Sequence, residues 1–119
     1  MVGQLRSVVL DCPQPSELAS FYEKLLGAER LPGDDDNWVV IVASGTRIAF
    51  QRCPGYRPPV FPDPHGSQQF HLDVLVEDVE EAEPKALALG ARLVQKDTDD
   101  DFRVYADPVG HTFCLVWLS

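Results

Sequence analysis

Apolar and polar positions along the chain follow a pattern that occurs twice. In each half, a short β-branched and aliphatic run predicts a strand, a segment with helical spacing follows, and two more apolar segments flank a glycine-containing turn. The strand segments are residues 7–11, 38–42 and 48–50 in the first half, and residues 71–76, 104–106 and 113–117 in the second. Gly27 and Gly90 follow the two helical segments, where glycine is favoured because φ is positive. The pattern predicts two copies of one module, each ordered strand, helix, strands.

The two helical segments are marked by different signals. Apolar residues with i, i+3, i+4 and i+7 spacing form one face of the first helix, which we expect to pack on a sheet: Leu18, Phe21, Tyr22 and Leu25. Ser16 is its expected N-cap. In the second segment Asp78 and Glu81 resemble a capping pair, but Pro84 removes a backbone hydrogen bond and predicts either a kink or a later start.

A proline-rich segment separates the two copies. Residues 53–67 hold five of the ten prolines, which excludes a helix or a central strand there. Tyr56, Phe61 and His65 make the segment more aromatic than a solvated linker requires. It is expected either to pack across an open edge of the structure or to cover a ligand.

Composition and charge narrow the possible functions. The chain has 119 residues, 45% of them hydrophobic, which fits one domain with a packed core. Its net charge of −9 makes nucleic acid an unfavourable partner. No run of about 18 apolar residues is present that could span a membrane, and the start resembles no signal peptide. The sequence therefore predicts neither a nucleic-acid partner nor a membrane partner.

Cysteines and acidic runs give no metal motif of their own. Cys12, Cys53 and Cys114 are widely spaced and odd in number, so neither a disulfide framework nor a zinc knuckle is expected, and a reducing cytoplasm fits best. The acidic runs at residues 34–36 and 97–101 lack the ligand spacing of a calcium loop, and we expect solvated turns.

Two stretches carry a resemblance to a known family. FHLDVLVEDVEEAEPKALALGARLV followed by FRVYADPVGHTFCLVW resembles the second module of the glyoxalase/bleomycin-resistance/extradiol-dioxygenase group, the vicinal oxygen chelate superfamily, and is most similar to its short glyoxalase-like branch. The first half matches more loosely, through SVVLD, FYEKLLGA and IAFQR. The resemblance implies an α+β fold of two βαβββ modules whose curved mixed sheets form a cleft, often completed by dimerisation. Within one domain, module one is expected at residues 5–53, the linker at 54–67 and module two at 68–119.

The resemblance also implies where a site would lie. Metal-dependent members of the superfamily take ligands from the first and last strands of each module. Ser7 and His71 match the first-strand positions, and Cys114 matches the last strand of module two. In module one the last-strand position falls at Ala49 or, with a shifted hairpin, at Gln51.

This set of residues is a poor fit to a catalytic metal. Ser7 and Gln51 are weak neutral donors and Cys114 is soft, so only His71 is a good ligand, and two histidines with one carboxylate cannot be assembled. Asp73 lies on the same side of the strand as His71 and could orient or charge it. His71 and Gln51 are expected to face one another across the cleft.

The favoured function is glyoxalase-like binding of a small organic molecule, of the resistance or sequestration type, without a catalytic metal. The ligand-binding residues would be His71, Gln51, Asp73, Ser7 and Cys114. A homodimer is expected, because short curved sheets leave open edges. The alternative is a metal-dependent lyase, isomerase or dioxygenase holding one divalent ion through His71 and Gln51, so enzymatic activity stays open. A ferredoxin-like interaction domain without a ligand site is a third possibility.

Overall fold

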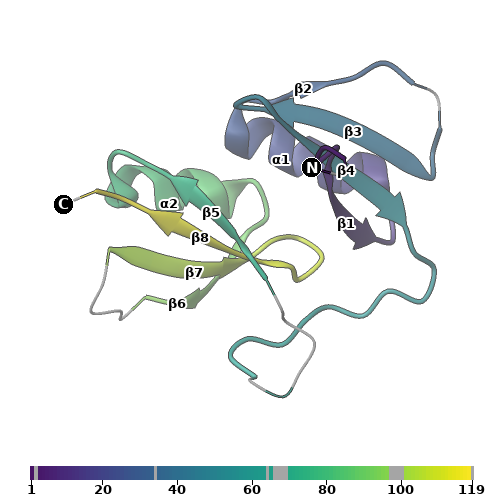
Figure 1. Ribbon diagram of the computed structural model, residues 1–119. Helices are drawn as coiled ribbons and strands as arrows, with labels where there is room; N and C mark the ends of the chain where they lie inside the picture. Colours follow the sequence, from purple (N-terminus) through teal and green to yellow (C-terminus); the bar gives the residue numbers. More distant parts are fainter. Residues whose placement is uncertain (2, 34, 64, 66–69, 97–100, 119) are drawn as a thin grey trace. The chain divides into compact units, whose positions relative to one another are not determined.

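The computed structural model describes residues 1, 3–33, 35–63, 65, 70–96 and 101–118. The chain divides into two compact units, Met1–Tyr56 and Arg57–Ser119. Among the described residues, each unit forms one four-stranded sheet with one helix (Figure 1). Of the two acidic runs, residue 34 and residues 97–100 lie outside the described residues, whereas Asp35, Asp36 and Asp101 are described and exposed.

Both units have the same order of elements. The first contains β1 (Val8–Cys12), α1 (Pro15–Leu26), β2 (Glu29–Arg30), β3 (Trp38–Ala43) and β4 (Thr46–Arg52). The second contains β5 (Leu72–Leu75), α2 (Val79–Ala88), β6 (Arg92–Gln95), β7 (Phe102–Ala106) and β8 (Thr112–Val116). The sheet orders are β1-β4-β3-β2 and β5-β8-β7-β6, with the first and last strand of each module paired in parallel. This confirms the α+β class and the two βαβββ modules.

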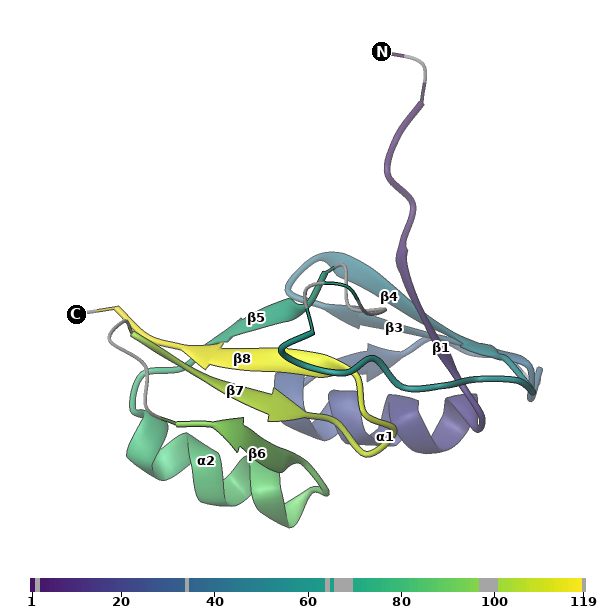
Figure 2. The same cartoon turned by 90° about the horizontal axis from the view of Figure 1, so that it is seen from below.

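An aromatic cluster holds α1 against the first sheet. Leu18, Phe21 and Tyr22 are buried, and the ring of Tyr22 stacks on Phe50 of β4 with 5.7 Å between centroids. Figure 2 shows each helix lying along one face of its own sheet. The predicted apolar face of α1 is therefore confirmed for these three residues, while Leu25 is only half-buried.

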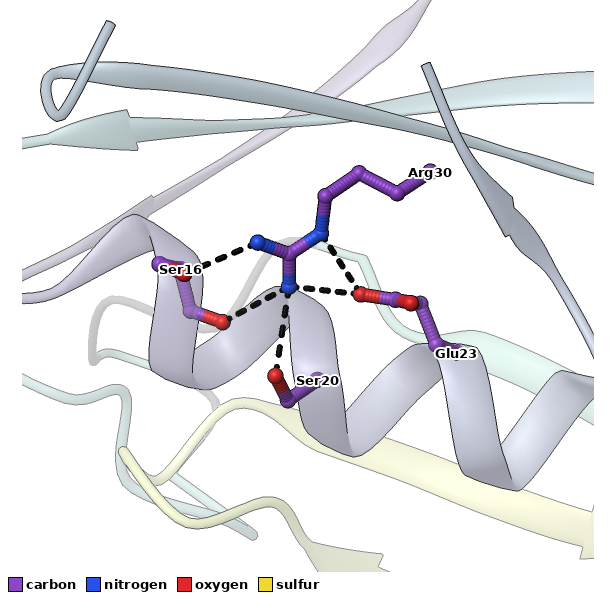
Figure 3. A network of polar contacts seen from close by, with 4 residues as sticks. All are labelled: Ser16, Ser20, Glu23 and Arg30. Carbon is purple, nitrogen blue, oxygen red and sulfur yellow. Dashed lines mark hydrogen bonds and ion pairs between the residues drawn. The ribbon is translucent and has the colours of Figure 1, made fainter. Parts of the chain in front are cut away.

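Ser16 is not the N-cap of α1, contrary to the sequence-based expectation. The N-cap is Gln14, without a side-chain capping bond, and Pro15 takes the first helical position, where its fixed φ suits the helix. Ser16 instead joins a network around Arg30 of β2 (Figure 3). The Arg30 guanidinium donates to Ser16 Oγ at 2.8 Å and to Glu23 Oε1 at 2.7 Å, and it also reaches Ser20. This network ties the short edge strand to the exposed side of α1.

Pro84 does not delay the start of the second helix, which was one of the two expectations. α2 starts at Val79, Asp78 caps it by accepting from the backbone N–H of Glu80 at 2.9 Å, and the helix continues through Pro84. The later start is therefore wrong. Capping at the first turn and packing of Val79 and Ala86 hold the helix despite the missing proline N–H.

From Arg57 on, the proline-rich segment belongs to the second unit and packs against it. Residues 53–63 and 65 contain no helix or strand. A side chain at Gly110, which has φ +95°, would place its Cβ 2.5 Å from Cβ of Pro58. Only glycine is compatible with both the positive φ and this approach. The segment thus passes directly over the turn between β7 and β8.

Candidate functional site

The two faces of the second sheet have different roles. Tyr105 and Phe113 stack with 5.5 Å between centroids, and the Tyr105 hydroxyl donates to Glu83 Oε1 on α2 at 2.7 Å, so these rings face the helix. Because strand residues alternate, Val104, Thr112 and Cys114 face the other side. Phe113 therefore belongs to the core under α2, and it is fully buried.

The face opposite α2 contains a cavity of about 390 Å³. Its residues come from all four strands, from the positions just before β5 and β7, and from the proline-rich segment: Phe61, His71, Asp73, Gln95, Asp101, Phe102, Val104, Thr112, Cys114 and Val116. This volume lies in the range of small-molecule sites, which combine an apolar wall with a few polar groups. Phe61 of the proline-rich segment forms part of this wall.

Three polar side chains converge at the β5–β8 side of this cavity. Nε2 of His71 lies 3.2 Å from Oδ1 of Asp73, as their shared strand face predicts. Asp73 pairs with Cys114 across the parallel β5–β8 ladder. Ligand atoms of His71, Asp73 and Cys114 all lie within 4.8 Å of one another. The structure thus brings together three of the five predicted site residues.

The Cys114 thiol is held in its neutral form at neutral pH. Burial of the side chain, and then the negative charge of Asp73, raise the pKa of Cys114 from 9.0 to about 11. A thiol is nucleophilic only as thiolate, so this environment opposes a role as nucleophile.

This pKa predicts slow alkylation of Cys114. In a variant with Cys12→Ser and Cys53→Ser, labelling by iodoacetamide should be slow at pH 7 and should rise until the pH reaches about 11, because the thiolate fraction rises over that range. Mass spectrometry of the labelled protein at several pH values measures the rate. Rapid labelling at pH 7 in the folded protein would contradict the prediction. The same shift means that the contribution of Cys114 to stability is constant below about pH 9 and is lost as the pH rises from about 9 to 11.

The other two predicted site residues belong to the first unit. Phe50 faces α1, so its neighbour Gln51 points to the opposite face of that sheet, where it is exposed. Ser7 precedes β1 and its Oγ accepts a hydrogen bond from Arg47 Nε at 3.3 Å. His71 lies in the second unit, so the meeting of His71 and Gln51 across a cleft stays a prediction.

Sequence reasoning missed an ion-pair cluster on the helix side of the second sheet. The buried Arg103 of β7 pairs with Glu80 and Glu83 of α2, and Glu83 also accepts from Tyr105. Burial and then Glu83 raise the pKa of Tyr105. The sequence contains a signal for this cluster. An arginine lies inside an apolar strand, and two glutamates stand three residues apart on the neighbouring helix.

The architecture defines the class of protein: paired βαβββ modules with an open, partly apolar cavity on a sheet face. A model of the glyoxalase-like domain family matches residues 7–116. The chain belongs to this family, which confirms its resemblance to the vicinal oxygen chelate superfamily.

Solved structures show the same fold at low sequence identity. A glyoxalase/bleomycin resistance protein/dioxygenase family enzyme from Burkholderia phytofirmans is 18% identical, with a TM-score of 0.78 over 98% of this chain and 100% of that one. An E126Q mutant of the fosfomycin resistance protein FosX from Listeria monocytogenes, complexed with Mn(II) and a dihydroxypropylphosphonic acid, is 15% identical, with a TM-score of 0.76 over 98% and 93%. A glyoxalase-related enzyme from Fulvimarina pelagi is 17% identical, with a TM-score of 0.72 over 98% and 89%. Comparison with curated protein sequences found no match.

The donor set can be compared with the metal that such a relative holds. His71, Asp73 and Cys114 offer one nitrogen, one oxygen and one sulfur, which in number and type suit Zn²⁺. The sulfur does not suit Mn²⁺, which prefers oxygen and nitrogen ligands.

Of the described helices, none is long and apolar enough to cross a membrane.

Proposed function

We propose that this protein binds a small organic molecule in the cavity of the second unit, without a catalytic metal. The observation that carries this proposal is the composition of the cavity wall, in which Phe61, Phe102, Val104 and Val116 form the apolar part. Such a wall gives most of its binding free energy by removing apolar ligand surface from water. The polar groups are few and fix the orientation of the ligand.

His71 and Asp73 supply the main directional contact. With Nε2 directed to Asp73, the imidazole keeps Nδ1 for the ligand, as an acceptor when neutral and as a donor when protonated. Both side chains are partly exposed, 42% and 60%, so the pair itself adds little to stability and is accessible to a ligand. A ligand with one hydrogen-bonding group on an apolar body fits this arrangement.

A thermal-shift screen of small aromatic and aliphatic compounds, with and without divalent metals, tests the proposal. Compounds that bind the native state raise the melting temperature. We expect stabilisation by apolar compounds with one polar group, unchanged by EDTA. Protein purified without a polyhistidine tag should contain less than one metal ion per chain by elemental mass spectrometry. Stabilisation that requires a divalent metal would overturn the metal-free proposal.

One observation favours a second candidate, a metal-dependent lyase, isomerase or dioxygenase. The convergence of His71, Asp73 and Cys114 within 4.8 Å gives three donors on one sheet face. A bound Zn²⁺ would act there as a Lewis acid on a substrate oxygen. Stoichiometric zinc in the tag-free protein, lost on His71→Ala, would overturn the metal-free proposal in favour of a lyase or isomerase. A dioxygenase would need a redox-active metal instead, because Zn²⁺ has no redox chemistry.

We also propose that the protein is a homodimer. β1 and β5 are edge strands of their sheets, and the apolar side chains of Val9 and Leu75 on them are exposed, 37% and 64% respectively. Exposed apolar edges favour pairing with a second copy. Light scattering at micromolar concentration should give twice the mass of one chain, 13.2 kDa, and a monomer mass would contradict the proposal.

A further inference from the structure

We propose that the first unit carries a binding site for a small oxyanion, a phosphate group above all. A cavity of about 360 Å³ lies where the chain enters β1 and where β3 turns into β4. The residues around it are Gln4, Leu5, Arg6, Ser7, Val8, Gly45, Thr46 and Arg47. Two of these eight are arginines, and none is acidic.

The fold brings these residues together through the parallel pairing of β1 with β4. Val8 pairs with Ile48, so the preceding residues Ser7 and Arg47 lie side by side at the start of the ladder. The turn before β4 has positive φ at Ser44, 50°, and at Gly45, 78°. This tight turn places Thr46 and Arg47 directly opposite the segment that leads into β1.

Arg47 is oriented without being neutralised. Its Nε donates to Ser7 Oγ at 3.3 Å, and the residue is half-buried. A guanidinium carries five N–H donors, so this bond leaves the four on its terminal nitrogens for a ligand. Those four present the planar fork that matches an oxyanion in a bidentate contact.

The charge around this cavity is the reverse of the charge on the whole chain. Arg30 and Arg103 pair with glutamates, whereas in the described part of the chain neither Arg6 nor Arg47 forms an ion pair. On this sheet face the next carboxylate along β1 is Asp11, four residues from Ser7 and about 13 Å away at the rise of a strand. In a protein of net charge −9, two unneutralised arginines at one cavity create a local site for an anion.

The lining favours a phosphate group over other ligands. The Thr46 hydroxyl and the Gln4 amide add neutral donors to the two guanidinium groups. A cation would meet two positive charges, and the overall negative charge of the chain opposes a large polyanion. A small molecule with one phosphate group meets neither obstacle.

Titration with inorganic phosphate, followed by two-dimensional NMR of backbone amides, tests the site. We expect saturable shifts centred on Thr46 and Arg47, with no comparable shift at Thr112 in the other cavity. Phenyl phosphate competing at the same amides would identify an organic phosphate as a ligand, and phosphate binding without such competition would restrict the site to the free ion. Absence of saturable shifts with both probes would overturn the proposal.

Matched arginine variants distinguish a specific phosphate site from a nonspecific effect of positive charge. Arg47→Gln should weaken phosphate binding by about 10-fold or more, the loss expected for a charge-assisted hydrogen bond. Arg52→Gln removes the same charge from the same strand outside the cavity and should change affinity by less than about 2-fold. Equal losses in the two variants would overturn the proposal.

Arg47→Lys adds a control for folding, since it keeps the positive charge and loses only the planar set of guanidinium N–H donors. Its affinity should fall between those of the wild type and Arg47→Gln, with unchanged circular dichroism. The outcome is independent of the proposed function, because the apolar-ligand screen reports on the cavity of the second unit.

Discussion

Replacing Arg103 by methionine is expected to lower the free energy of unfolding by about 3 kcal/mol, the range found when one partner of a buried ion pair is removed. The side chain of Arg103 is only 10% exposed, and its Nη1 lies 3.3 Å from Glu83 Oε1. Glu83 is itself 15% exposed and would remain as a poorly solvated carboxylate with Tyr105 as its hydrogen-bond donor. Methionine keeps much of the packing volume, so the loss measures mainly the uncompensated charge. Urea unfolding followed by circular dichroism gives the value.

Glu80→Gln is the matched control for Arg103. The Glu80 side chain is 70% exposed, so water compensates its loss and the expected change is below about 1 kcal/mol. A small effect of Arg103→Met, or equal effects of the two substitutions, would show that the cluster does not stabilise α2 on the sheet. An unchanged slope of free energy against urea would show that the two variants unfold from the same compact state.

Much of the fold was predictable because its signals are local and repeated. Gly27 and Gly90 adopt the positive φ expected after each helix, 62° and 114°. Leu18, Phe21 and Tyr22 form the buried face that their spacing predicts. The same pattern occurs in both halves, so the order of elements predicted for one half supports the order predicted for the other.

The predictions that were wrong or missing concern contacts between residues that are far apart in the sequence. Ser16 resembles an N-cap in the local sequence, but its hydroxyl accepts a hydrogen bond from Arg30, which lies on a strand that follows the helix. The short strands β2 and β6 owe their existence to pairing with β3 and β7, which local propensity does not report. Arg103 was missed for the same reason, because its partners lie on another element.

The candidate site was predictable only within one module. His71 and Asp73 share a strand face by alternation, and Cys114 joins them because β8 pairs with β5 in register. Phe61 and Gln95 reach the same cavity from a proline-rich segment and from an edge strand. No spacing rule connects those residues to His71, so packing alone could place them there.

Replacing His71 by alanine should weaken binding of a compound found in the thermal-shift screen by about 1–3 kcal/mol, or roughly 5-fold to 150-fold. The substitution removes the directional polar contact and leaves Asp73 without its partner, while the apolar wall is unchanged. Isothermal titration calorimetry measures the loss. His65→Ala is the matched control, because His65 is exposed and does not line the cavity, so its affinity should equal that of the wild type.

Asp73→Asn separates the two parts of the His71 contact. The amide oxygen can still accept from Nε2 of His71, so the ring keeps its orientation, but the carboxylate charge is lost. Asp73→Asn should therefore weaken binding less than His71→Ala does, because Nδ1 of the ring still contacts the ligand. Equal affinities of wild type, His71→Ala and Asp73→Asn would show that the ligand lies elsewhere.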